Sequence, residues 1–223
     1  MTIASQWKQL LSILYVALPF VFPKFSARHK LHSPAKQPTP GDLWQCFIVV
    51  ARNQTISTLL HAAMISFSAR SLYRFDASLP GILEIFQHVA LAFLIHEILF
   101  YYTYRLSHHP SLYPSIHKPH HRFVAPVALA AQYATMTEHL FSNVMPVQLP
   151  FMILNAHIVT FWIFLSLELV QTATDHSGFD FFAGKARDHD LHHEKSVVNF
   201  GSAGLMDWLH GTEGSSNTGS EAD

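Results

Sequence analysis

Charged residues are scarce in this chain of 223 residues. Asp, Glu, Lys and Arg make up 13% of it, whereas hydrophobic residues make up 49%. An average soluble domain has about 25% charged residues. The formal net charge is -1, so the chain lacks the basic excess with which nucleic-acid-binding proteins contact phosphates. The composition favours a membrane protein and predicts no nucleic-acid partner.

Cysteine is almost absent as well. Cys46 is the only one, so an internal disulfide is impossible and metal sites built from several thiolates are excluded. The chain also lacks a GxGxxG dinucleotide fingerprint and any haem or flavin signature. If the chain carries out a redox reaction, its electrons must therefore come from a separate protein.

Histidine, by contrast, is abundant, with 17 residues against 14 Lys plus Arg. Five histidines lie in residues 108–121 and four in residues 176–193. Each segment contains a His, two other residues and a His pair: His117-Lys118-Pro119-His120-His121 and His189-Asp190-Leu191-His192-His193. Positions i, i+3 and i+4 share one face of a helix, and neutral imidazole is a common metal ligand. We predict that each triplet points at one spot. Together they exceed what one tetrahedral zinc can use, which predicts a two-metal centre.

Long apolar stretches surround these clusters. Residues 82–104 are long enough to cross the ~30 Å hydrocarbon core of a bilayer. Residues 43–68 form a second candidate, with Arg52, Asn53 and Gln54 inside it. Residues 127–174 are apolar on both sides of residues 155–157, which is typical of a helical hairpin dipping into the bilayer. Residues 9–23 predict a short membrane helix or an interfacial segment, with a cleaved signal peptide as the alternative. We expect an all-α, multi-pass membrane helical bundle.

The two His clusters can share a centre only on one side of the membrane. Metal–nitrogen bonds measure ~2.0–2.1 Å, whereas one crossing separates groups by ~30 Å. The hairpin supplies an even number of crossings between the clusters. Positive residues favour the cytoplasmic side, so we predict a cytosolic-facing, histidine-rich helical cap. The side shared with the clusters collects most of the basic residues: Lys24, Arg28, Lys30, Lys36, Arg105, Lys118, Arg122, Lys185, Arg187 and Lys195.

Further motifs accompany the clusters over more than half of the chain, from about Ala92 to Thr212. They are residues 100–109 (FYYTYRLSHH), Ala125-Pro126-Val127, Glu138-His139, Asp175-His176-Ser177-Gly178 and residues 205–212 (LMDWLHGT). With them the chain resembles the fatty acid hydroxylase/sterol desaturase superfamily of integral-membrane, non-haem di-iron enzymes.

The resemblance implies an oxidoreductase that holds two iron ions in a cage of histidines on the cytosolic ends of membrane helices. Such enzymes use O₂ and electrons, commonly from cytochrome b5 and its reductase, to hydroxylate, oxidatively demethylate or desaturate lipids and sterols at the endoplasmic reticulum. Sterol, terpenoid, fatty acid and alkane substrates all fit the sequence. The implied metal ligands are His108 or His109, His117, His120, His121, His176, His189, His192 and His193, with Asp180 as a further candidate.

Two positions depart from the family pattern. Tyr104 stands where the first motif begins with a histidine, and Asp180 stands where the His-Ser-Gly element ends in one. A carboxylate is a normal ligand in di-iron bundles, but a neutral phenol is a poor one. The alternative hypothesis is therefore a catalytically altered or inactive member that serves as a membrane scaffold or regulator. A zinc hydrolase or metal transporter would need more polar residues inside the bilayer than Arg52, Glu97 and Glu138.

Three regions follow from these assignments. Residues 1–81 form an N-terminal membrane or anchor region, and residues 82–212 form the hydroxylase-like di-iron domain. The remaining residues, 213–223, are polar and rich in Gly and Ser, which predicts a disordered tail.

Overall fold

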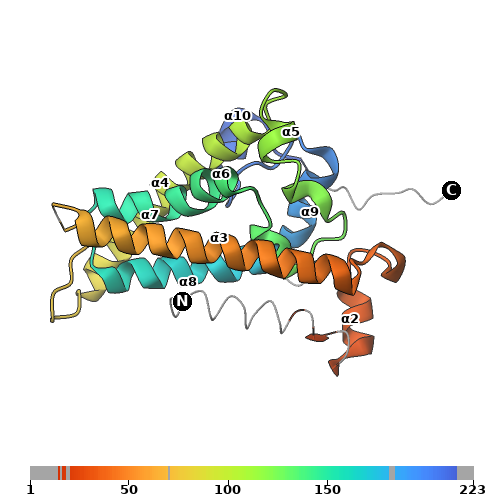
Figure 1. Cartoon of the computed structure of the whole chain (residues 1–223), viewed down its shortest axis with the longest axis horizontal. Helices are drawn as coiled ribbons and strands as arrows, with labels where there is room; N and C mark the ends of the chain where they lie inside the picture. The colour runs from red at the N-terminus through yellow and green to blue at the C-terminus, as the bar shows by residue number, and fades with distance from the viewer. Residues whose placement is uncertain (1–14, 16, 19–20, 70, 181–183, 215–223) are drawn as a thin grey trace.

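The computed structural model describes residues 15, 17–18, 21–69, 71–180 and 184–214 (Figure 1). Its described residues form helices and no strand, with two isolated bridges that join Lys30 to Phe179 and Arg74 to His157. The all-α prediction is confirmed for this part of the chain. Most of the predicted apolar segment 9–23 and of the predicted tail 213–223 falls outside the described residues.

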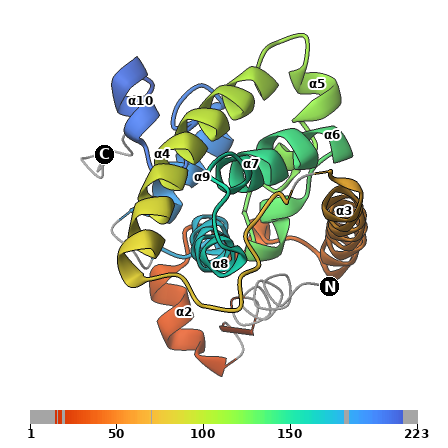
Figure 2. The same ribbon diagram turned by 90° about the vertical axis from the view of Figure 1, so that its left-hand side faces the viewer.

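Four helices form an elongated bundle: α3 (Pro40–Phe67), α4 (Ile82–Ser107), α7 (Met145–Ile153) and α8 (Ile158–Asp175). Figure 2 looks along the bundle and shows α8 between α4 and α3. The start of α3 is fixed by a reciprocal capping box, in which Thr39 and Asp42 each accept from the other's backbone N–H. The core between the helices is aromatic: Tyr73, Phe151, Phe161 and Phe164 are almost fully buried there.

The predicted hairpin is present, with its apex at residues 154–157. Asn155 adopts a left-handed conformation (φ 46°), and Nδ1 of His157 caps α8 by accepting from the Val159 backbone N–H at 3.2 Å. The first arm is less regular than expected. It consists of a 3₁₀ turn, η3 (Ala128–Gln132), a short α6 (Met136–Glu138), a π-helix, η4 (His139–Val144), and α7.

Two of the described helices, α4 and α8, are long and apolar enough to cross a membrane. Much of α4 is unburied, and Leu83, Phe86 and Leu94 are exposed on it. The helix α3 has sufficient length but does not meet the same measure of hydropathy. We ascribe this to the polar residues in its middle, of which Asn53 is fully buried and donates to the Ala134 carbonyl at 2.9 Å.

Short elements gather at one end of the bundle and form a cap: α5 (Tyr113–Ile116), η2 (His120–Arg122), α9 (Lys185–Lys195) and α10 (Leu205–His210) (Figure 1). Two buried carboxylates hold its C-terminal part. Asp207 accepts from the backbone N–H groups of Phe200 (2.8 Å) and Gly201 (2.6 Å), and Glu97 of α4 accepts from that of Ala203 (3.0 Å). Two short elements precede α3: α2 (Pro23–His29) and η1 (Pro34–Lys36). The segment between them also contacts the cap, because Nε2 of His32 lies 2.7 Å from Oδ1 of Asp190.

Gly178 permits a close backbone approach just after α8. Its φ is +71°, and a Cβ there would lie 2.7 Å from the carbonyl oxygen of Pro126. We expect Gly178→Ala to destabilise the protein by about 2–3 kcal/mol, through backbone strain and this overlap. The measurement is the melting temperature of the purified protein in detergent. Gly81→Ala is the matched control, because Gly81 has an ordinary φ of -64° and open space around it. Equal melting temperatures for the two variants would show that the approach is not tight.

Candidate metal centre

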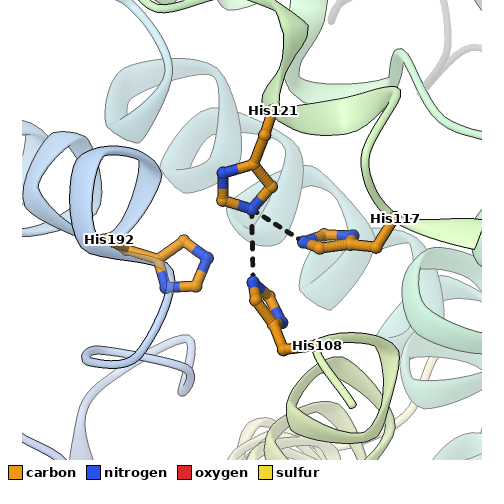
Figure 3. A group of neighbouring side chains, drawn as sticks. All are labelled: His108, His117, His121 and His192. Carbon is orange, nitrogen blue, oxygen red and sulfur yellow. Dashed lines mark hydrogen bonds between the residues drawn. The ribbon is translucent and has the colours of Figure 1, made fainter. Parts of the chain in front are cut away.

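Eight histidines at the cap end of the bundle form two groups of four. Within each group, one ring nitrogen from every residue lies within 4.8 Å of the others. Group one is shown in Figure 3, where its four rings point toward one another. Group one consists of His108, His117, His121 and His192, and group two of His120, His176, His189 and His193.

Each His-x-x-His-His motif is divided between the two groups, so the prediction that one motif points at one spot is wrong. The i and i+4 residues His117 and His121 belong to group one, whereas the i+3 residue His120 belongs to group two. The second motif is divided in the opposite sense, because its i+3 residue His192 joins group one. The first motif is not a regular helix, since it runs from the end of α5 into the 3₁₀ turn η2. The split ties both motifs to both groups.

The Nε2 atoms converge in each group. In group one, Nε2 of His121 lies 3.2 Å from that of His108 and 2.9 Å from that of His117. In group two, consecutive Nε2 atoms of His120, His176, His189 and His193 are separated by 3.4, 2.9 and 3.1 Å.

The opposite ring nitrogen, Nδ1, fixes the tautomer of group one. Nδ1 of His108 donates to the Tyr104 carbonyl (2.9 Å), and Nδ1 of His121 donates to the His193 carbonyl (3.3 Å). Nδ1 of His192 donates to the Val198 carbonyl (2.6 Å). A carbonyl oxygen can only accept, so the proton is on Nδ1 and the Nε2 lone pair faces inward.

In His117, the fourth member of group one, Nδ1 is oriented by a carboxylate in place of a carbonyl. Its Nδ1 lies 2.6 Å from Oε1 of Glu138, and both side chains are almost fully buried. In group two, His120 and His176 are oriented in the same way by the carbonyls of Tyr133 (3.3 Å) and Thr172 (3.0 Å).

This donor arrangement fits a metal ion at each group. Inward lone pairs about 3 Å apart repel each other and cannot form a hydrogen bond. Two nitrogens bonded to one cation at ~2.1 Å would lie roughly 3.0–3.4 Å apart, depending on the bond angle. Moreover, Nε2 of His192 is buried and has no partner among the described residues. Both the spacing and this unpartnered nitrogen match what a metal would require.

Burial also favours the neutral, metal-binding form of the imidazoles. Desolvation lowers the pKa of His108 to about 4 and that of His189 to about 3. Desolvation, assisted by the neighbouring imidazoles, holds the pKa values of His120, His192 and His193 well below the ordinary value.

Acid should therefore destabilise the metal-free protein. An unfolded histidine has a pKa of about 6.5, so below that pH the unfolded chain binds protons that the folded groups exclude. The free energy of unfolding is highest above about pH 6.5 and falls as the pH decreases toward 4. We expect the melting temperature of chelator-treated protein to fall steeply between about pH 7 and about pH 5, with a smaller drop for metal-loaded protein. A flat profile for the chelator-treated protein would contradict the burial of neutral imidazoles.

A cavity of about 540 Å³ with mostly apolar walls reaches the histidines. Its lining includes His120, His176 and His189, all from group two, and no member of group one. From there it follows α8 as far as Phe161 and Trp162 at the opposite end of the bundle. A hydrophobic molecule in this cavity would therefore meet group two first.

Comparison with known proteins gives the family. A sequence model of the fatty acid hydroxylase family matches residues 89–212, which include all eight grouped histidines. The chain belongs to the fatty acid hydroxylase family. The superfamily predicted from the histidine motifs is thus confirmed.

Several relatives extend the match beyond this region. The chain is 33% identical to the human fatty acid hydroxylase domain-containing protein 2 over 202 residues, which are 86% of this chain and 58% of that protein. It is 32% identical to fatty acid hydroxylase ahd1 of Mycosarcoma maydis over 85% of this chain and 50% of that protein. It is 27% identical to methylsterol monooxygenase 2-2 of Arabidopsis thaliana over 88% of this chain and 79% of that protein. The chain thus spans only between half and three fifths of the length of the first two of these relatives. No solved structure matches it.

Two of the candidate metal ligands predicted from the sequence lie outside the groups. His109 is exposed, and its Nδ1 contacts Oγ of Ser111 at 2.6 Å, so His108 is the member of this pair that joins group one. Asp180 forms an ion pair with Arg187 (2.9 Å) and accepts from the Gly184 backbone N–H (3.1 Å).

Tyr104 lies beside group one, at the position where the family pattern has a histidine. Its side chain is 3% exposed, and its ring centre is 4.8 Å from that of His117, 5.0 Å from that of His108 and 5.1 Å from that of His192. Its hydroxyl is buried without a partner in the described part of the chain. The departure therefore places a phenol, and no imidazole, against group one.

The contact of Glu138 with His117 is the feature that the sequence analysis missed. In the sequence, Glu138 is part of a Glu-His motif and lies inside an apolar stretch, but nothing assigns it a partner. A carboxylate in such surroundings needs a partner, and this signal could have linked it to one of the histidines.

Proposed function

We propose that this chain is a membrane-bound, O₂-dependent di-iron oxidoreductase that hydroxylates, oxidatively demethylates or desaturates a hydrophobic lipid, sterol or terpenoid. The supporting observation is the pair of four-histidine groups with inward Nε2 atoms at the end of an apolar cavity. The names of the relatives agree with lipid oxidation, since they include hydroxylases and methylsterol monooxygenases.

The eight histidines would hold two iron ions, one at each group, with O₂ as co-substrate. When bound, iron supplies O₂ activation and the one-electron chemistry that side chains lack. The protein's own contribution is placement. Carbonyls and Glu138 orient the imidazoles, and the cavity excludes water and holds a C–H bond of the substrate near group two.

The surroundings of the site are part of the same proposal. The bilayer would surround α4 and α8, and the substrate would enter from it. We place the protein in the endoplasmic reticulum, with the histidine-rich cap facing the cytosol. Electrons would come from a cytochrome b5/reductase-type partner, because the sequence carries no redox motif of its own besides the histidines.

The function can be tested by expressing the chain in a host cell and profiling lipids, sterols and terpenoids by mass spectrometry. We expect an oxygenated or desaturated product in cells with the wild-type chain and none with His120→Ala. Product formation that is equal in the two strains would contradict the proposal.

Tyr104 favours a second candidate, a non-catalytic family member that acts as a membrane scaffold. Asp180, the other departure from the family pattern, forms an ion pair with Arg187 and belongs to neither histidine group. The scaffold predicts that the purified protein binds no iron and consumes no O₂, whereas the enzyme predicts roughly two irons per chain.

A further inference from the structure

A row of polar side chains on α3 faces the cavity. Gln54, Ser57 and His61 all line it and are spaced three and four residues apart, so they share one face of the helix. Polar groups among apolar helices are costly unless they find hydrogen-bond partners. The position of each hydrogen-bond partner therefore indicates the role of these side chains.

The first two residues of this row have partners on the hairpin. The amide of Gln54 donates to Oε1 of Gln132 in η3. Oγ of Ser57 lies 3.3 Å from Nε2 of His139, the first residue of the π-helix η4. All four side chains line the cavity.

For Nδ1 of His61, the third residue of the row, no hydrogen-bond partner is found in the described part of the chain. Both α3 and the η4–α7 arm run away from the cap (Figure 1), and the residues four positions beyond Ser57 and His139, which are His61 and Asn143, also line the cavity. Nδ1 of His61 and Nδ2 of Asn143 are buried, line the cavity and have no partner among the described residues. The π-helix that carries Asn143 is a rare backbone form often found at functional sites.

We propose that His61 and Asn143 form a polar subsite that binds the oxygen of a hydroxyl or carbonyl group on an elongated lipid ligand. An oxygen between them can accept from the Asn143 amide and exchange a hydrogen bond with the His61 imidazole. The ring of His61 is held in place by stacking on Phe161, with ring centres 6.1 Å apart and planes within 10°.

The subsite lies far from the histidine groups. Phe161 is 15 positions before His176 on α8, which corresponds to ~22 Å of helix. The ligand class is therefore a long hydrocarbon whose polar end lies at the subsite while its other end reaches group two. The inference rests on the proposed function for treating the cavity as a substrate site, and it adds recognition of the end that does not react.

Binding of two matched probes tests the subsite. The full chain, loaded with iron in lipid nanodiscs, is titrated with tritiated hexadecanol and with tritiated hexadecane in a scintillation proximity assay. We expect the wild type to bind hexadecanol about tenfold more tightly than hexadecane. In His61→Phe, which keeps the stacked ring, and in Asn143→Leu, the preference should fall to about twofold or less, while hexadecane affinity is unchanged.

His88→Phe is the matched control, because His88 lies on α4 and is not part of the cavity lining. This variant should keep the full preference for hexadecanol. A wild type that binds both probes equally, or a His61→Phe protein that keeps the full preference, would overturn the subsite.

Iron content and lipid oxidation are measured on the same preparations. A hexadecanol preference that depends on His61, found without oxidation products, would support the subsite and contradict the proposed function. Oxidation products found without such a preference would support the proposed function and contradict the subsite.

Discussion

His192→Ala should lower the iron content from about two per chain to about one or less, and should reduce lipid oxidation below a hundredth of the wild-type level. His192 is fully buried, its Nδ1 donates to the Val198 carbonyl at 2.6 Å, and its Nε2 faces group one without a partner among the described residues. Removing it takes away one of four converging nitrogens and leaves a void that water can enter. Metal analysis of the purified variant by mass spectrometry measures the effect.

His109→Ala is the matched control for this substitution. His109 is adjacent to His108 of group one, but it is exposed and contacts Ser111, outside both groups. We expect wild-type iron content and activity from it. If His109→Ala lost iron while His192→Ala kept it, the division of the histidines into the two groups would be wrong.

Glu138→Ala should weaken iron binding by about 10- to 100-fold, although Glu138 is not itself a member of either group. Its Oε1 receives the Nδ1–H of His117 and so holds the Nε2 lone pair toward group one. Without this acceptor the ring is free to rotate or to change tautomer. The rate of iron loss to a chelator, followed by absorbance, measures the change.

Glu138→Gln separates orientation from charge. The glutamine carbonyl can still accept from Nδ1, so this variant should recover most of the wild-type affinity. Glu194→Ala is the control, because Glu194 is an exposed residue of α9, and it should behave as wild type. Equal chelator rates for Glu138→Ala and the wild type would show that Glu138 does not orient His117.

Much of the bundle could be predicted from the sequence, because long apolar stretches leave few choices for the backbone. The helix at residues 82–104 and the hairpin apex at residues 155–157 follow from such patterns. The irregular arm from Ala128 to Val144 could not be predicted, because its 3₁₀ and π turns depend on packing against α3 and on contacts such as that of Ser57 with His139.

The candidate site was predictable in its residue types but not in its pairing. Spacing alone suggested one spot for each motif. An irregular backbone is not what divides the motifs, because the second motif lies within the regular helix α9 and is divided as well. The spacing also does not distinguish His108 from His109, because adjacent side chains at the end of α4 point in different directions. The ion pair of Asp180 with Arg187 could not be predicted either, because Arg187 lies on a separate element.

The central claim is that two distinct groups of four histidines each hold a metal ion. An anomalous difference map, from crystals of the iron-loaded protein measured at the iron absorption edge, tests it directly. We predict two peaks, one among the Nε2 atoms of group one and one among those of group two. A map with no peak at either group, or with iron bound only elsewhere on the chain, would contradict it.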